Sequence, residues 1–321
     1  MVFIGYHASH EQLPPSRLLA AVQEAERAGF DGAMCSDHFA PWGLAQGESG
    51  HAWSWLGAAL ATTRFSLGVV TAPGQRYHPA VSAQAFATLS EMFPGRFWAA
   101  LGSGEALNEH ITGDEWPPKP EREQRLVEVV DVIRRLHAGE RVDHDGLVRV
   151  HDARVWSLPS DPPALRAAAA SARTASLTAA WADGLITVGH DPGTVRQIIE
   201  AYREAGGRGP CAVQVHVCLA GSDGDGLQIA REQWPQATVP PQLMWEIAQP
   251  EEFDRLADPT DRQALERGVL ISADDDETAE KLAALAAVGA DELYLHEVGT
   301  DQSAFLARAG GGLLDLVRRL T

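Results

Sequence analysis

The sequence predicts an α/β fold of the (β/α)8 TIM-barrel type with insertions. Short apolar runs typical of buried strands alternate with helical stretches along most of the chain, which favours a parallel sheet. About eight strand–helix units can be traced, and that number favours closure of the sheet into a barrel. The length of 321 residues is ordinary for such a barrel. Because no linker or repeat divides the chain, we expect one domain over residues 1–321.

The first half of the chain is expected to supply four strand–helix units. Glycine and proline mark their boundaries, since Gly29 closes the first helix and Pro79 opens the third. The Asp145-Gly146 pair is a turn signal typical of a hairpin. The expected strands are 3–8, 32–36, 65–70 and 97–101, the expected helices are 16–28, 53–62, 79–92 and 121–137, and the hairpin covers 141–150.

The second half repeats the same alternation. Residues 221–272 show only helical or loop patterns and contain Pro235, Pro240 and Pro241. We expect this segment to form a helical insertion over the barrel mouth. The expected strands are 165–170, 184–188, 213–219 and 291–296, and the expected helices are 174–181, 194–205, 277–288 and 302–320.

The composition excludes several classes of partner. A formal net charge of −18 argues against nucleic acids and anionic membrane surfaces. The chain has no long apolar run, and its first residues lack the features of a signal peptide. Three cysteines, Cys35, Cys211 and Cys218, fit neither a disulfide framework nor a metal site. We therefore expect a reduced, cytoplasmic protein that binds a small-molecule substrate and no metal.

The stretch from Ser36 to Trp42 is where we place the chemistry. A buried apolar strand runs directly into Asp37 and His38, and Pro41 then ends any strand ladder. Reactive groups gather at such strand ends in a barrel, and an imidazole can accept a proton near neutral pH. Trp42 offers a flat wall for a planar ligand. The alternative is a capped turn with one surface histidine.

Four blocks in the same order resemble the luciferase-like flavin and deazaflavin oxidoreductases. They are Ser36-Asp37-His38-Phe39-x-Pro41-Trp42, Gly74-Gln75-Arg76-Tyr77-His78-Pro79-Ala80-Val81, Phe93-Pro94-Gly95-Arg96 and Gly102-Ser103-Gly104-Glu105-Ala106-Leu107-Asn108-Glu109. The sequence is most similar to the branch of deazaflavin-dependent glucose-6-phosphate dehydrogenases and to a sister branch that uses FMN. The resemblance implies either FMN, which we slightly prefer, or the deazaflavin coenzyme F420. The deazaflavin carries an anionic glutamyl tail, which the negative net charge weakly disfavours.

The resemblance also implies roles for individual residues. His38 matches the proton acceptor in alcohol oxidation, Glu105 a second carboxylate at the reaction centre, and Trp42 a brace for the developing charge. A helix-terminal acid remains the alternative for Glu105, and core packing the alternative for Trp42. A strained cis peptide is expected at Val70–Thr71. The implied cofactor contacts are Asp37, Val70, Thr71, Ser103, Gly104, Asn108, Ala169, Ala170, Ser171 and Gly189.

Substrate and assembly are less defined. Arg255 and Arg267 resemble positions that hold a substrate phosphate in relatives, and His296 ends the last strand at the mouth. Both arginines could instead pair with neighbouring acids, so glucose 6-phosphate is not the preferred substrate. Three functions stay open: a dehydrogenase of an alcohol or lactol, an FMN-dependent monooxygenase, and a non-catalytic flavin-binding protein. Relatives that the chain resembles are homodimers packed through early barrel helices, although the apolar stripe on helix 79–92 is also explained by barrel packing.

Overall fold

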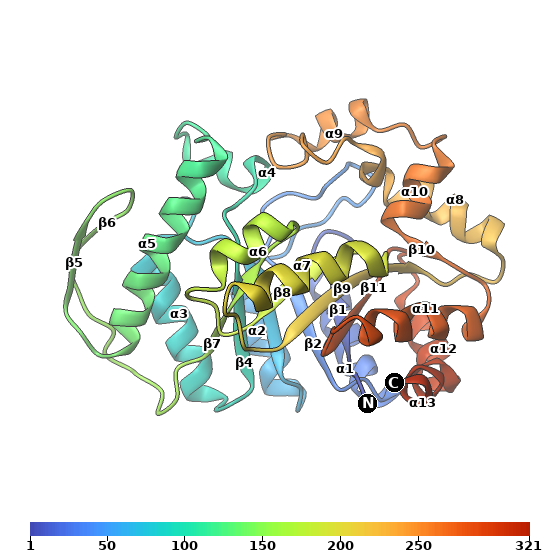
Figure 1. Ribbon diagram of the computed structural model, residues 1–321, viewed down its shortest axis with the longest axis horizontal. Coiled ribbons are helices and arrows are strands. Elements are labelled where there is room, and N and C mark those ends of the chain that lie inside the picture. The colour runs from blue at the N-terminus through green and yellow to red at the C-terminus, as the bar shows by residue number, and fades with distance from the viewer.

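Eight parallel strands of the computed structural model, which describes residues 1–321, close into a barrel (Figure 1). Around the barrel the order is β9-β11-β1-β2-β3-β4-β7-β8, and β8 pairs back to β9 to close the ring. The barrel strands are β1 Phe3–Ala8, β2 Gly32–Ser36, β3 Leu67–Thr71, β4 Phe97–Leu101, β7 Ala164–Ala168, β8 Leu185–Val188, β9 Cys211–Cys218 and β11 Glu292–Glu297. The predicted (β/α)8 barrel is confirmed.

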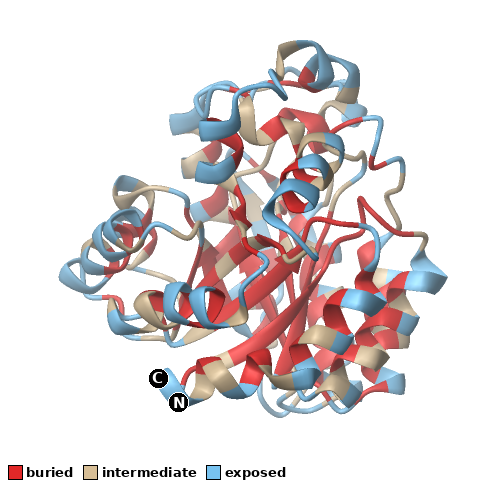
Figure 2. Cartoon of the chain, turned by 90° about the vertical axis from the view of Figure 1, so that its right-hand side faces the viewer, coloured by how far each residue is buried: buried red, intermediate tan, exposed pale blue.

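Helices cover the outside of the barrel, as Figures 1 and 2 show. Local sequence sets their ends: α7 begins with a proline after the capping side chain of Asp191, and α1 ends where Gly29 adopts a φ of 94°. The α-helices are α1 Pro15–Ala28, α2 Ala52–Thr62, α3 Pro79–Met92, α4 Ala106–Glu109, α5 Lys119–His137, α6 Ala172–Thr178, α7 Pro192–Glu204, α8 Asp223–Gln233, α9 Pro250–Leu256, α10 Arg262–Gly268, α11 Asp275–Ala287, α12 Gln302–Arg308 and α13 Leu314–Leu320. No helix is both long enough and apolar enough to cross a membrane.

Three details differ from the expectations. The cis peptide predicted at Val70–Thr71 was wrong, because the backbone has no cis bond and β3 stays in register with β4 through Thr71. The segment 221–272 contains a two-residue strand, β10 Leu270–Ile271, which pairs with β9 beside the helices α8, α9 and α10. The predicted helix 302–320 is broken between α12 and α13 by a wider turn at Ala309–Leu313, where Gly312 has a φ of 152°.

Two further segments lie outside the barrel wall. The hairpin of β5 Val142–Asp145 and β6 Arg149–Ala153 lies beside α5, at one edge of the molecule (Figure 1). Helices α8, α9 and α10 lie at the end of the molecule opposite the two chain termini (Figure 1). These helices therefore lie on the side of the barrel to which the carboxyl ends of the strands point.

The barrel interior is filled by a small cluster, which gives the mouth a solid floor. Inward-facing side chains of Met34, Trp98, Ile186 and Tyr294 pack together and are almost fully buried. Gly68 faces Trp98 directly, and a side chain at this position would overlap the indole ring. A larger cluster of 63 buried residues fills the layer between the strands and the outer helices. These two layers fix the strand ends from which the functional side chains project.

Candidate active site

His38 lies between two carboxylates at the barrel mouth. Its Nδ1 atom is 3.4 Å from Glu11 Oε1, and its Nε2 atom is 3.6 Å from Glu105 Oε2. Glu11 follows β1, His38 follows β2 and Glu105 follows β4, so all three come from the rim where barrel enzymes place reactive groups. The structure thus brings the predicted pair together and adds Glu11, which the sequence analysis missed. The available signal was the polar run that directly follows the first strand.

The two carboxylates are shifted in opposite directions. Burial acts to raise the pKa of Glu11, but His38 and the hydroxyls of Ser9 and Ser36 outweigh it and hold that pKa below its ordinary value. Burial raises the pKa of Glu105, and the charge on His38 opposes this only in part. Glu11 is therefore a fixed anion on one side of the imidazole, while Glu105 takes up a proton more readily on the other.

Asn108 ties the loops of the first and fourth sequence blocks together. Its Oδ1 accepts a hydrogen bond of 2.8 Å from the backbone N–H of Phe39, and its Nδ2 donates to Glu105 Oε2 at 3.2 Å. On the other side of the loop, Ser49 donates to the carbonyl oxygen of His38. The position of His38 relative to Glu105 is therefore fixed by side-chain bonds as well as by the strands.

Trp42 connects the imidazole to the insertion. Its ring centroid lies 5.0 Å from that of His38 and 5.3 Å from that of Phe253 in α9, where the two rings meet edge to face. Trp42 also packs against the two buried clusters that contain Ile247 and Trp234. It therefore packs in a core and lines one side of His38, and its role as a brace for developing charge stays a prediction.

Asp37 is the centre of a buried polar network. Its carboxylate accepts hydrogen bonds from Thr71 Oγ1 at 2.7 Å and from the Tyr77 hydroxyl at 3.2 Å. Arg76 Nη2 lies 3.4 Å from the same carboxylate, and Arg76 Nε lies 3.5 Å from Glu109. The side chains of Asp37 and Glu109 are only 1% and 2% exposed. Thr71 and Asp37, both implied as cofactor contacts, are therefore bonded to each other.

Arg76 and Glu109 belong to the second and fourth sequence blocks, but the sequence alone predicts no role for either. Burial raises the pKa of Glu109 to about 7, although Arg76 acts to lower it. One guanidinium thus serves two buried carboxylates, which makes it the electrostatic centre of the β2–β3–β4 side of the mouth. The sequence alone does not reveal that Arg76 pairs with both acids, because it lies 33 positions from Glu109 and 39 positions from Asp37 in the chain.

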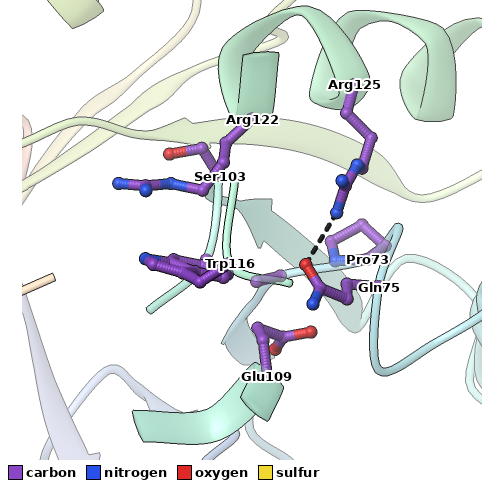
Figure 3. A pocket seen from close by; sticks show the side chains of 9 residues that line it. Pro73, Gln75, Ser103, Glu109, Trp116, Arg122 and Arg125 are labelled. Atoms are coloured by element: carbon purple, nitrogen blue, oxygen red, sulfur yellow. Dashed lines mark hydrogen bonds between the residues drawn. The ribbon is translucent and has the colours of Figure 1, made fainter. Parts of the chain in front are cut away.

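A small hollow lies beside the fourth sequence block (Figure 3). Arg122 lies over the ring of Trp116 at 4.3 Å, and Arg125 donates to Gln75 at 2.7 Å, as the dashed line in Figure 3 shows. The volume of about 10 Å³ has room for roughly one water molecule, so a phosphate does not fit there. The lining residues are Ala72, Pro73, Gln75, Ser103, Gly104, Glu109, Trp116, Arg122 and Arg125.

The implied cofactor contacts after β7 and β8 differ in exposure and in partners. Ser171 Oγ accepts from the backbone N–H of Thr174 and so serves as the N-cap of α6. Ala169 is buried, but Ala170 is exposed. Gly189 has a φ of 136°, and a side chain at this position would meet no neighbouring atom. The backbone after β7 and β8 is therefore accessible, although the Ser171 hydroxyl is already used.

Small and apolar side chains leave room for a planar ring at the mouth. Val70 and Ala168 pack partly against the floor cluster and stay partly accessible, while Val188, two residues beyond the floor residue Ile186, is 38% exposed. A flat apolar surface bordered by Asp37, Thr71 and the Gly102–Glu105 loop suits an isoalloxazine-type ring. This apolar surface and its polar border thus fit the ring of a flavin or deazaflavin. No group of three or more metal-binding side chains is present.

The predicted substrate contacts differ in burial and in partners. Arg255 projects from α9 with its side chain 67% exposed and pairs with Glu252 at 3.2 Å, as the ion-pair alternative proposed. Arg267 is exposed on α10. His296 is only 2% exposed and bonds to Gln12 Oε1 at 2.6 Å. The charge of Arg255 is therefore paired, and His296 is buried and hydrogen-bonded.

Comparison with known proteins yields one family match and several close relatives. A family model described as luciferase-like monooxygenase matches residues 1–292. The F420-dependent glucose-6-phosphate dehydrogenase of Microbacterium testaceum is 36% identical, over 98% of this chain and 97% of its own length. The enzyme of the same name from Beutenbergia cavernae is 35% identical, over 99% and 98%. The solved structure of an F420-dependent secondary alcohol dehydrogenase with an F420–acetone adduct superimposes with a TM-score of 0.90 at 29% identity, over 99% of each chain.

Proposed function

The chain belongs to the luciferase-like monooxygenase family, and from this premise we propose that it is an F420-dependent dehydrogenase of an alcohol with His38 as general base. The observation that carries the proposal is the position of His38 between Glu11 and Glu105 at the mouth. The relatives named above support the deazaflavin rather than FMN, which the sequence analysis slightly preferred.

Residues at the mouth are suited to hold the cofactor ring. Val70, Ala168 and Val188 form the apolar surface for the ring, and Asp37 with Thr71 borders it. When bound, the deazaflavin supplies a carbon that accepts a hydride from the substrate. The protein's own contribution is to place the alcohol carbon against the ring and to remove the hydroxyl proton.

His38 takes that proton at Nε2. Its Nδ1 atom and Glu11 Oε1 lie 3.4 Å apart and are both buried without a hydrogen-bond partner, so we assign the ring hydrogen to Nδ1, on the side of this carboxylate. This arrangement leaves the Nε2 lone pair for the substrate hydroxyl, and the Glu11 carboxylate stabilises the imidazolium that forms. Glu105 lies beyond Nε2 and is the natural next acceptor of the proton, because its raised pKa brings it closer to that of an imidazole.

The test is anaerobic titration of the purified protein with F420, followed by addition of a panel of alcohols. We expect F420 to bind and its absorbance to fall as an alcohol reduces it. The family name favours a second candidate, an FMN-dependent monooxygenase. Oxygen consumption with reduced FMN, together with failure to reduce F420, would replace the dehydrogenase by this second candidate.

We also propose that the protein forms a homodimer through α3. The apolar residues on this helix fall into two groups. Phe86 and Leu89 pack in the core, whereas Val81 and Met92 are 56% and 55% exposed. Exposed side chains of this size on one helix suit an interface between copies. The double variant Val81→Asp/Met92→Asp is expected to halve the mass measured by light scattering. A wild-type protein that is monomeric at micromolar concentration would contradict the proposal.

A further inference from the structure

A continuous series of hydrogen bonds runs through four side chains that we call the polar wall: Gln12, Gln214, His216 and His296. His216 Nδ1 lies 3.3 Å from the backbone carbonyl oxygen of Gly268. Gln214 Nε2 lies 3.2 Å from His216 Nε2 and 3.3 Å from His296 Nδ1. At the other end, His296 Nε2 lies 2.6 Å from Gln12 Oε1. The polar wall therefore joins β9 and β11 to the loop after β1.

The two ends of this series fix the direction of every bond in it. The backbone carbonyl beside His216 can only accept, so His216 donates from Nδ1 and keeps a lone pair on Nε2. Gln12 donates its amide to the carbonyl of Val298, so its Oε1 accepts from His296 Nε2. Gln214 must then give one amide hydrogen to each imidazole. Its Oε1 makes no hydrogen bond within the protein and remains an acceptor.

The imidazoles of the polar wall are neutral, as this pattern requires. Burial lowers the pKa of His216 to about 4 and that of His296 well below its ordinary value. His7 stacks on His296 with ring centroids 4.4 Å apart, and burial lowers its pKa to about 3. Three adjacent imidazoles would repel one another if charged, so none offers a positive charge to a ligand.

The polar wall stands at the mouth beside the catalytic group. Gln214 is two residues beyond Ala212, which belongs to the floor cluster, so it faces inward at a higher level of the barrel and is only partly buried. The charges of Glu11 and His38 both act on His7, which contacts the wall through His296. His7 therefore links the polar wall, through His296, to the neighbourhood of Glu11 and His38.

Charges around the mouth disfavour a phosphate. Glu11 and Glu105 flank His38, and the nearby guanidinium of Arg76 is held by Asp37 and Glu109. A phosphate ester brings two negative charges and acceptor oxygens, whereas the hydrogens of Gln214, His216 and His296 are already donated within the protein. An uncharged hydroxyl brings the hydrogen that Gln214 Oε1 lacks.

We propose that Gln214 is a specificity-determining residue whose amide oxygen accepts a hydrogen bond from a second hydroxyl of an uncharged alcohol substrate. The substrate class is therefore a diol or an unphosphorylated sugar. The inference rests on the proposed function for its reaction, but the hydrogen-bond pattern of the polar wall is independent of which cofactor takes the hydride.

The experiment compares the full-length wild type with Gln214→Met, which keeps the side-chain length but removes the amide. Propane-1,2-diol and propan-2-ol probe the second hydroxyl, and glucose and glucose 6-phosphate probe the charge. We expect the wild type to favour the diol over the mono-alcohol, and glucose over its phosphate, in kcat/KM. In Gln214→Met the value for the diol should fall about tenfold, while propan-2-ol changes less than about threefold. Gln228→Met, on the exposed face of α8, is the matched control and should change neither value.

Two binding measurements separate this inference from the proposed function. Saturation-transfer NMR with the two propane alcohols reads binding without turnover, so the wall is tested even in a protein that reduces no F420. The affinity for F420, from quenching of its fluorescence, should be within about twofold of wild type in Gln214→Met. Loss of F420 affinity would mean that the oxygen binds a ring N–H instead. That result, an equal loss for both alcohols, or a preference for glucose 6-phosphate would overturn the inference.

Discussion

Replacing His38 with alanine is expected to lower turnover by about 10²–10⁴-fold while the affinity for F420 stays nearly unchanged. The reason is that hydride departure from an alcohol carbon requires loss of the hydroxyl proton, and His38 Nε2 is the group positioned to take it. The pH profile of turnover should also lose its limb near neutrality, where an imidazole titrates. Steady-state reduction of F420 across pH, with fluorescence titration of the cofactor, measures both effects.

Two flanking variants serve as controls for this result. Glu11→Gln removes the anion beside Nδ1 and should reduce turnover less than His38→Ala, because the imidazole itself remains. Glu105→Gln should also keep the limb near neutrality if His38 is the base. If His38→Ala retains its turnover and its pH limb, Glu105 or a water molecule is the base, and the role of His38 is lost.

The second large effect is expected from Arg76→Met, which should lower the free energy of unfolding by about 3–5 kcal/mol. The side chain of Arg76 is only 7% exposed, and its removal leaves the buried carboxylates of Asp37 and Glu109 without a counter-charge. Urea denaturation followed by fluorescence measures the loss. Arg255→Met is the matched control, because the exposed pair of Arg255 with Glu252 should contribute at most about 1 kcal/mol.

The pH dependence of the Arg76 variant adds an independent check. Burial raises the pKa of Glu109 to about 7 from an ordinary value of 4.5, so the folded protein binds this proton more tightly than the unfolded chain. The stability that the proton contributes is present below about pH 4.5 and is lost as the pH rises through 7. Without Arg76 the pKa of Glu109 rises further. The stability of the variant should therefore keep falling with pH up to a higher pH than that of the wild type. A variant as stable as wild type at pH 8 would contradict the network.

The sequence was sufficient to predict the barrel and the meeting of His38 with Glu105. Strand–helix alternation is a local signal, and parallel strands of one barrel end at the same rim, so two polar strand ends must approach each other. Glu11 was missed because the polar run after the first strand places an acid at the rim but does not identify His38 as its partner. Its role depends on a contact across 27 positions of the chain.

Other errors have local physical causes. The two-residue strand β10 is too short to show alternation, so residues 270 and 271 were assigned to the insertion. The break after α12 follows from three consecutive glycines, Gly310 to Gly312, which favour an interruption that helical periodicity alone does not reveal. The cis peptide at Val70–Thr71 was carried over from relatives, and no pattern in the strand itself required it.

The fit of Gly68 against Trp98 limits the order in which this lineage can change. An alanine at position 68 would collide with the indole while the tryptophan is present. Gly68 therefore cannot be replaced before Trp98 is. Shrinking Trp98 first leaves a cavity under Arg166, whose guanidinium lies 4.1 Å from the ring and pairs with Glu292. Either path begins with a less stable ancestor, so the two positions are expected to vary together or not at all among descendants of this barrel.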